Sequence, residues 1–233
     1  MTPFLDAIIL DTEATTNKDT PERPLEVIEL AWIPLSPGDD LPGGFSRRYK
    51  PKLQSTFGAT AVHHILPSDL ADCAPSAQAP QDVPPAKYWI GHNIDFDWKA
   101  LGSPPGVKRI CTLALSRSLW PECDAHNLSA MMYFTQGCKP EVRERLRSAH
   151  AATDDCEFVL TILQTIMAVT KTRDLAGLHE LSEEARIPKT MQFGKFKGEP
   201  ISAVDRGYAS WYARQEDVDP YVIVAFKRQG LLR

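Results

Sequence analysis

The stretch Ala7-Ile8-Ile9-Leu10-Asp11-Thr12-Glu13 decides how the rest of the chain can be interpreted. An apolar run that ends in acidic residues is typical of a buried strand that presents polar side chains at its end. Asp11 and Glu13 are two residues apart, so on an extended chain both carboxylates point to the same face. Two such carboxylates repel each other unless a cation lies between them. The first hypothesis is therefore an oxygen-ligated metal ion at the end of this strand.

The segments on either side of this stretch predict the fold class. Further strands are expected at Glu26–Leu35, Phe45–Lys50, Tyr88–Gly91 and Arg109–Cys111, and helices from about Asp95, up to Trp120, at Leu128–Phe134 and after His150. Strands first, followed by alternating strands and helices, indicate an α/β domain with a mixed sheet. The proline-rich connection at 73–86 is either an interdomain linker or a surface loop. The loop is favoured because chemistry-bearing segments lie on both sides of it.

Composition narrows the class of protein further. The chain has 233 residues, of which 43% are hydrophobic and 24% charged, as in a globular protein with a sizeable core. No apolar run approaches the ~20 residues of a membrane helix, and the beginning of the sequence has no basic leader. The five cysteines are widely spaced without a Cys-x-x-Cys pair, which excludes a disulfide framework and argues against a zinc ribbon. A cytoplasmic protein without membrane contact is expected.

The C-terminal part differs in charge from the rest. Residues 186–233 carry nine basic and five acidic side chains, whereas residues 1–185 carry 17 basic and 25 acidic ones. We expect a main domain at 1–185 and a small basic α+β module at 186–233 that docks on it. The module has a glycine-punctuated segment at 193–198 and helical patterns at 207–216 and 220–229. It would contact nucleic acid or cap the core through Phe193, Phe196 and Trp211.

Two more polar segments extend the acidic set. They are His92-Asn93-Ile94-Asp95-Phe96-Asp97 and His150-Ala151-Ala152-Thr153-Asp154-Asp155, both near expected helix starts. Four carboxylates are enough to bind two divalent ions, and two Mg²⁺ ions ~3.5–4 Å apart are the usual arrangement for phosphodiester cleavage. His150 is the candidate general base, because histidine titrates near neutral pH.

The three segments, in this order, resemble the three motifs of the DEDDh 3′–5′ exonuclease superfamily, which includes proofreading polymerase subunits and RNase T. The motifs are Asp-x-Glu, His-Asn-x-x-Phe-Asp and His-x-x-x-x-Asp, and the last of them selects Asp155 rather than Asp154. Segments 57–70, 110–121 and 193–211 resemble the exodeoxyribonuclease X group in particular. Thr16 departs from the glycine of many relatives, and the insertion that follows it, up to Leu25, is longer. The resemblance implies a ribonuclease-H-like mixed sheet flanked by helices.

The resemblance also implies a set of site residues. The catalytic set would be Asp11, Glu13, Asp97, His150 and Asp155, and the metal ligands its four carboxylates, Asp11, Glu13, Asp97 and Asp155. Substrate would be contacted by Thr12, Ala14, Thr15, His63, His92 and Asn93. For His92 and Asn93 an alternative stays open, namely that they brace the turn that aims Asp97. For His63 two roles stay open, substrate binding or a purely structural one, and the sequence favours neither.

The function implied is a 3′–5′ exonuclease that uses two Mg²⁺ or Mn²⁺ ions. It would act on 3′ ends of DNA, single-stranded or at a frayed duplex, and release nucleoside 5′-monophosphates. The runner-up is an RNase T-like 3′–5′ exoribonuclease, because the same residues serve both reactions. An alternative from a different class is a catalytically silent nucleic-acid-binding protein. The intact set of four carboxylates argues against it. The sequence gives no indication of a protein partner.

Overall fold

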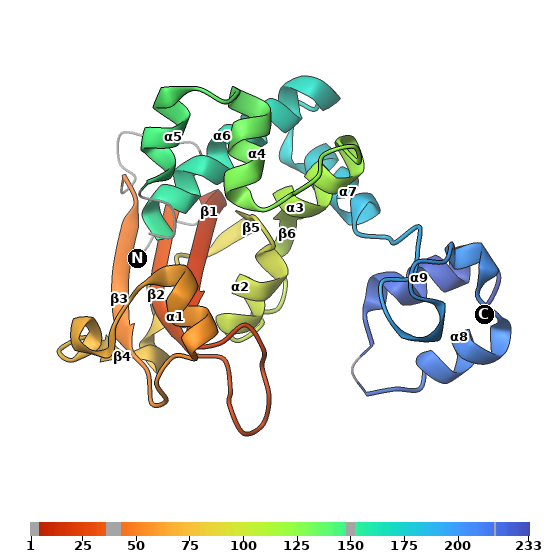
Figure 1. Ribbon diagram of the computed structural model, residues 1–233, viewed down its shortest axis with the longest axis horizontal. Helices are drawn as coiled ribbons and strands as arrows, with labels where there is room; N and C mark the ends of the chain where they lie inside the picture. The colour runs from red at the N-terminus through yellow and green to blue at the C-terminus, as the bar shows by residue number, and fades with distance from the viewer. Residues whose placement is uncertain (1–4, 36–42, 148–151, 217) are drawn as a thin grey trace. The chain divides into compact units, whose positions relative to one another are not determined.

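The computed structural model describes residues 5–35, 43–147, 152–216 and 218–233. These residues divide into two compact units, one up to His179 and one from Glu180 to Arg233, and each is described by itself (Figure 1). Within the described ranges, no helix is both long enough and apolar enough to cross a membrane.

The first unit is built on a six-stranded sheet with the strand order β4-β3-β2-β1-β5-β6 (Figure 1). The strands are β1 (Leu5–Ala14), β2 (Val27–Pro34), β3 (Phe45–Lys50), β4 (Ala74–Pro75), β5 (Ala86–Gly91) and β6 (Lys108–Cys111). The first three form an antiparallel meander, while β5 and β6 run parallel to β1. The mixed sheet expected from the sequence is thereby confirmed.

The central strand β1 is longer than its apolar run, because it continues through the acidic residues to Ala14. It pairs with β2 from Ile8 to Ala14, but with β5 only from Leu5 to Ile9. The end of β1 therefore extends past its parallel neighbour. At the end of β5, a Cβ on Gly91 would lie 3.0 Å from the Leu10 carbonyl oxygen, so glycine permits the close approach of the two strands.

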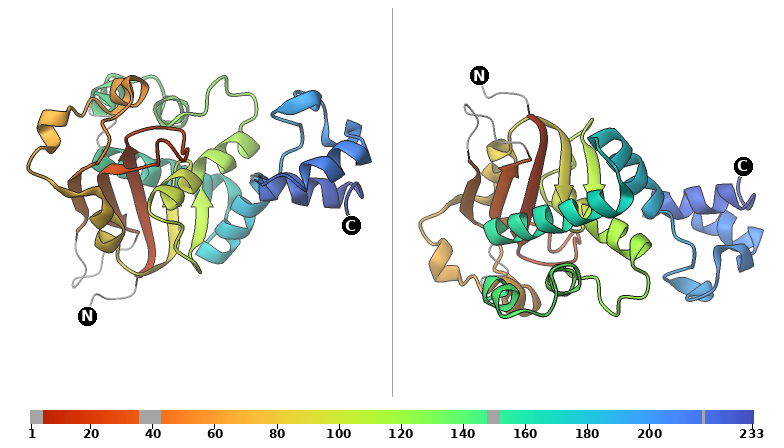
Figure 2. Two further views of the ribbon diagram at one scale, coloured as in Figure 1. Left: turned by 90° about the horizontal axis from the view of Figure 1, so that it is seen from below. Right: turned by 90° about the horizontal axis from the view of Figure 1, so that it is seen from above.

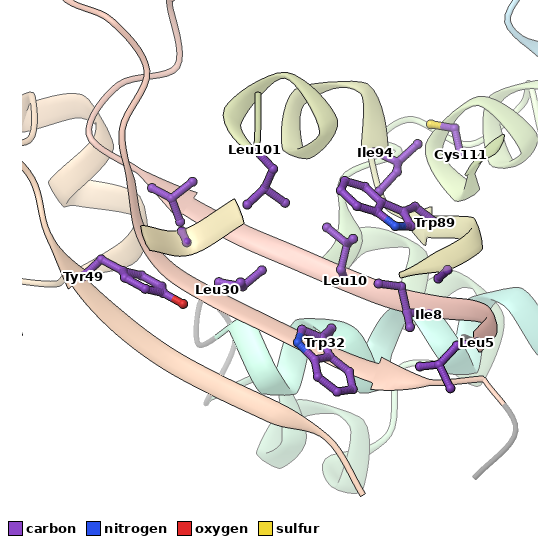
Figure 3. Packing of buried hydrophobic residues seen from close by; sticks show 13 residues of the cluster. Leu5, Ile8, Leu10, Leu30, Trp32, Tyr49, Trp89, Ile94, Leu101 and Cys111 are labelled. Atoms are coloured by element: carbon purple, nitrogen blue, oxygen red, sulfur yellow. The ribbon is translucent and has the colours of Figure 1, made fainter. Parts of the chain in front are cut away.

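Helices cover both faces of the sheet. Helix α6 (Ala152–Thr170) crosses one face, as the right-hand view of Figure 2 shows. The buried thiol of Cys156 on α6 lies 3.8 Å from the Ile9 carbonyl oxygen and 3.6 Å from that of Ala31. The opposite face carries the apolar cluster of Figure 3, in which Ile8 and Leu10 pack with Ile94 of α2 (Ile94–Ala100). Alternation along β1 thus places even-numbered side chains toward α2 and odd-numbered ones toward α6.

The remaining elements of this unit are shorter. They are α1 (Phe57–His63), α3 (Thr112–Leu119), α4 (Leu128–Gln136), α5 (Pro140–Leu146) and the 3₁₀ helices η1 (Pro67–Leu70) and η2 (Ser76–Asp82), and α7 (Leu175–Ala185) runs into the second unit. The proline-rich connection consists mostly of β4 and η2. Its Asp82 accepts hydrogen bonds from Tyr49 Oη at 2.7 Å and, through its carbonyl, from Trp32 Nε1 at 3.0 Å. This segment is therefore packed surface structure inside one unit and not a linker.

The second unit has a small core of its own. It contains η3 (Gly194–Phe196), η4 (Ile201–Ala203), α8 (Arg206–Tyr212) and α9 (Pro220–Arg228). Its buried side chains are Met191, Ile201, Val204, Ala209, Tyr212, Val222, Ala225 and Phe226. The hairpin-like start is held by hydrogen bonds from Met191 N to Glu199 O and from Gly198 N to Met191 O, both 2.8 Å. The expected docking of this module on the first unit stays a prediction.

Candidate active site

Three acidic side chains meet at the end of β1. Asp11 and Glu13 come from the α6-facing side of the strand, and Asp155 comes from the first turn of α6. One carboxylate oxygen from each lies within 4.8 Å of the others. Asp155 is buried, and the other two are partly exposed. Three carboxylate oxygens this close match the oxygen ligands that hard divalent cations prefer.

Asp97 is joined to the same strand from the α2 side. Its Oδ1 accepts hydrogen bonds from the Thr12 main-chain N at 2.9 Å and from Thr12 Oγ1 at 2.7 Å. The Thr12 N–H is available because this part of β1 has no partner strand on the β5 side. Asp97 reaches it because α2 follows β5 directly, after a turn in which Asn93 has the left-handed φ of 80°. Thr12, which lies between Asp11 and Glu13, therefore holds the carboxylate of Asp97 in place.

Burial and mutual repulsion raise the pKa values of these carboxyl groups. Burial is the largest cause of the raised pKa of Asp11, followed by the charges of Asp97 and Asp155. Burial also raises the pKa of Glu13 to about 8, with Asp155 and then Glu29 as the main charged neighbours. Burial raises the pKa of Asp97 to about 7, although the Thr12 hydrogen bonds lower it. This cluster of carboxyl groups is stable near neutral pH only if some of them keep their protons or if a cation lies among them.

Glu29 is a further buried acid at this site that the sequence interpretation missed. It lies on β2 directly opposite Glu13 and is 5% exposed. Its carboxylate accepts hydrogen bonds from Arg48 Nε at 2.8 Å and from the Ala152 main-chain N, where α6 begins, at 3.0 Å. The signal in the sequence was an acid within the apolar run Val27-Ile28-Glu29-Leu30. Such an acid at a half-buried strand position requires a partner.

The expected general base, His150, lies outside the described residues. The structure resumes at Ala152, and Asp155 three residues later belongs to the acidic group. The role of His150 stays a prediction.

His92 has both ring nitrogens in hydrogen-bond contact with protein. Its Nε2 lies 2.7 Å from the His126 carbonyl oxygen, and its Nδ1 lies 3.0 Å from Thr112 Oγ1. Burial lowers the pKa of His92 to about 4, so the ring is neutral at physiological pH. These contacts support the bracing role, because they fix the turn that leads to Asp97. Asn93 in that turn is exposed.

The other expected substrate-binding residues lie in or near the same strand end. Ala14 and Thr15 are buried, and the Thr15 carbonyl accepts a hydrogen bond of 2.8 Å from Thr56 N, just before α1. His63 at the end of α1 is buried, and its Nδ1 accepts from Ile65 N at 2.9 Å. Burial lowers the pKa of His63. Substrate contact by these three residues, and by Thr12, stays a prediction.

Two curated proteins resemble this chain in sequence. No family model matches the chain. Exodeoxyribonuclease 10 of Escherichia coli (strain K12) is 27% identical over 192 residues, which are 79% of this chain and 83% of that protein. The same protein from E. coli O6:H1 matches equally well.

Solved structures agree on the fold. Exonuclease X in complex with 5′ overhanging duplex DNA superimposes with a TM-score of 0.58 at 23% identity, covering 76% of this chain and 99% of that one. The zinc-bound E. coli ExoI–ssDNA complex gives 0.53 at 15% identity, covering 73% of this chain and 42% of that one. The fold is thus ribonuclease-H-like, and the resemblance of the sequence to the exodeoxyribonuclease X group is confirmed.

Proposed function

We propose that this protein, which resembles exodeoxyribonuclease 10 and has the ribonuclease-H-like fold of the DEDDh exonucleases, is a metal-dependent 3′–5′ exonuclease of DNA. It hydrolyses terminal phosphodiester bonds and releases nucleoside 5′-monophosphates. The observation that carries the proposal is the convergence of Asp11, Glu13 and Asp155 within 4.8 Å at the end of the central strand.

The donor set fits divalent metal ions. Asp11, Glu13 and Asp155 offer three carboxylate oxygens, and Asp97 adds a fourth carboxylate through its attachment to Thr12. We assign two ions, Mg²⁺ or Mn²⁺, to these ligands, because hard cations favour carboxylate oxygens. When bound, such ions neutralise the charge of the phosphate and lower the pKa of water.

The protein's own groups orient and move protons around that chemistry. Thr12 holds Asp97 in place with two hydrogen bonds. Glu29 fixes the start of α6, which carries Asp155. His150 accepts the proton of the attacking water, since it is the residue of the set whose ordinary pKa lies near neutrality. His92 keeps the turn before α2 in shape through His126 and Thr112.

DNA is the preferred substrate in this proposal, because the curated relative is named an exodeoxyribonuclease and covers most of the chain. The solved neighbours include one complex with overhanging duplex DNA and one with single-stranded DNA. We therefore expect 3′ ends, single-stranded or at a frayed duplex, as the binding partner. A cytoplasmic location is consistent with the five free cysteines.

Digestion of labelled oligonucleotides tests the proposal. Matched DNA and RNA strands, each labelled at the 3′ or the 5′ end, are incubated with Mg²⁺, Mn²⁺ or EDTA. A 3′–5′ deoxyribonuclease releases the 3′ label at once as a mononucleotide and shortens 5′-labelled DNA stepwise, with no reaction in EDTA. Faster degradation of RNA would favour the exoribonuclease, and an inert protein that still binds DNA would favour the silent relative.

A further inference from the structure

The C-terminal unit has aromatic side chains that its core leaves partly exposed. The buried cluster of this unit includes Tyr212 and Phe226, and Phe196 and Tyr208 pack against its edge. Trp211, in contrast, is 49% exposed, and Phe193 is 37% exposed. Such rings are available to a partner, because burying an aromatic side chain would stabilise a complex.

The rings of Phe196, Tyr208 and Trp211 form a continuous row. The ring centres of Phe196 and Tyr208 are 5.1 Å apart, and those of Tyr208 and Trp211 are 5.3 Å apart. Gly194 lies against the middle ring, since a Cβ at this position would come within 2.1 Å of Tyr208 Oη. The middle of the row is therefore held in place by the backbone, and its outer end, Trp211, presents its ring to solvent. We name Phe196, Tyr208 and Trp211 the aromatic row.

One cationic side chain lies against the row, and three more lie close to it in the sequence. Lys195 Nζ is 4.9 Å from the centre of the Phe196 ring. Arg206 begins α8 and Arg214 follows its end, so they flank the helix that carries Tyr208 and Trp211. Arg206, Arg214 and Lys197 are exposed, and among the described residues none of them makes an ion pair. Lys195 also pairs with Asp205, with Nζ 3.7 Å from Oδ2, so the cations most available to phosphates are Arg206, Arg214 and Lys197.

We propose that the aromatic row and its flanking cations bind single-stranded DNA. Unpaired bases offer π-faces that stack on aromatic side chains, and phosphates pair with arginine and lysine. A double-stranded partner keeps its bases stacked on each other and cannot use an exposed tryptophan in this way. The proposal deepens the proposed function, on which it rests for the choice of DNA. It gives the C-terminal unit the role of holding the strand whose 3′ end is hydrolysed.

Binding of the full-length protein to an oligothymidylate in EDTA tests this proposal, because hydrolysis is then stopped. Fluorescence anisotropy is measured for the wild type and for Trp211→Ala, Trp211→Phe and Val224→Ala. Val224 is an exposed apolar residue of the same unit, on α9, and serves as the matched control. Loss of one base stack weakens binding roughly 5- to 100-fold. We expect that loss for Trp211→Ala, a smaller one for Trp211→Phe, and wild-type affinity for Val224→Ala.

Two further measurements separate this binding from other roles of the surface. Arg206→Ala combined with Arg214→Ala should flatten the dependence of affinity on salt concentration, because fewer counterions are released. Unchanged oligothymidylate affinity in Trp211→Ala would overturn the proposal, and a lowered Tm alongside it would assign the surface to packing. An equal loss for blunt duplex DNA would overturn the stacking role. Digestion in Mg²⁺ by the wild type tests the proposed function separately.

Discussion

Glu13 on β1 and Glu29 on β2 lie directly opposite each other in the antiparallel strand pair. Facing like charges destabilise a sheet unless other groups compensate them. Here Arg48 of β3 and the main-chain N–H of Ala152 compensate Glu29. The hydrogen bond to Ala152 connects residues 123 positions apart in the sequence and fixes the start of the helix that supplies Asp155.

Replacement of Glu29 should therefore disturb both stability and turnover. Glu29→Ala leaves the buried N–H of Ala152 without its acceptor, which costs about 1–3 kcal/mol of unfolding free energy. Because the start of α6 shifts, turnover should fall roughly 10- to 100-fold, as small misplacements of catalytic groups do. Glu29→Gln keeps an oxygen that can accept from Ala152 and should restore most of both. Denaturant unfolding and 3′-label release measure the two effects.

The control for this prediction is Glu157→Ala, which removes an exposed acid from the same helix. It should leave stability and turnover near wild type. If Glu29→Ala were as active and as stable as this control, Glu29 would have no positioning role.

The stability of the metal-free protein should fall as the pH rises. The pKa of Glu13 is raised in the folded state from 4.5 to about 8, and that of Asp97 from 3.8 to about 7. Between pH 4 and 8 the folded state thus binds more protons than the unfolded state, and the free energy of unfolding decreases with pH. Melting curves in EDTA should show a lower Tm at pH 8 than at pH 5.5.

Added Mg²⁺ should reverse this trend, because a cation replaces the protons between the carboxylates. The rise in Tm on adding Mg²⁺ should be larger at pH 8 than at pH 5.5. Glu13→Gln should reduce the pH dependence in EDTA, since it removes one titrating group and one charge from its neighbours. An equal Mg²⁺ effect at both pH values would contradict the assignment of these carboxylates as ligands.

Thr12→Val should shift the pH profile of the reaction. The Thr12 hydroxyl donates to Asp97 and lowers the pKa of that carboxyl group. Valine keeps the shape and the main-chain hydrogen bond but removes the hydroxyl, so the pKa of Asp97 should rise further above about 7. Rates measured from pH 6 to 9 at fixed Mg²⁺ should show the acidic limb moved to higher pH. Thr12→Ser, which keeps the hydroxyl, should retain the wild-type profile.

His150→Ala should lower turnover by roughly 10²–10⁴, the usual contribution of a general base. Metal binding should change little, because the carboxylate ligands remain; Mg²⁺-dependent stabilisation in melting curves measures it. His64→Ala is the control, since His64 is exposed at the end of α1. Wild-type rates for His150→Ala across pH 6–9 would remove this histidine from the mechanism.

Much of the fold could be predicted from local patterns. The apolar run before Asp11 and the three strands that begin the sheet follow from short-range periodicity, which the structure confirms. Helices α1, α5 and α7 were not predicted; α1 and α5 have only seven residues each, which is too few to show a helical repeat. The position of Glu29 beside the acidic group was also missed, since one acid in an apolar strand gives no sign of its neighbours until the register is known.

The sequence by itself predicted which residues carry the chemistry. It also determined that Asp11 and Glu13 share one face, because alternation along a strand is a local property. Only the tertiary structure decided that α6 covers that face and brings Asp155 to within 4.8 Å of both. It alone also decided the raised pKa values of Glu13 and Asp97. Burial and the distances between charges arise from packing of segments far apart in the chain, and no local pattern contains them.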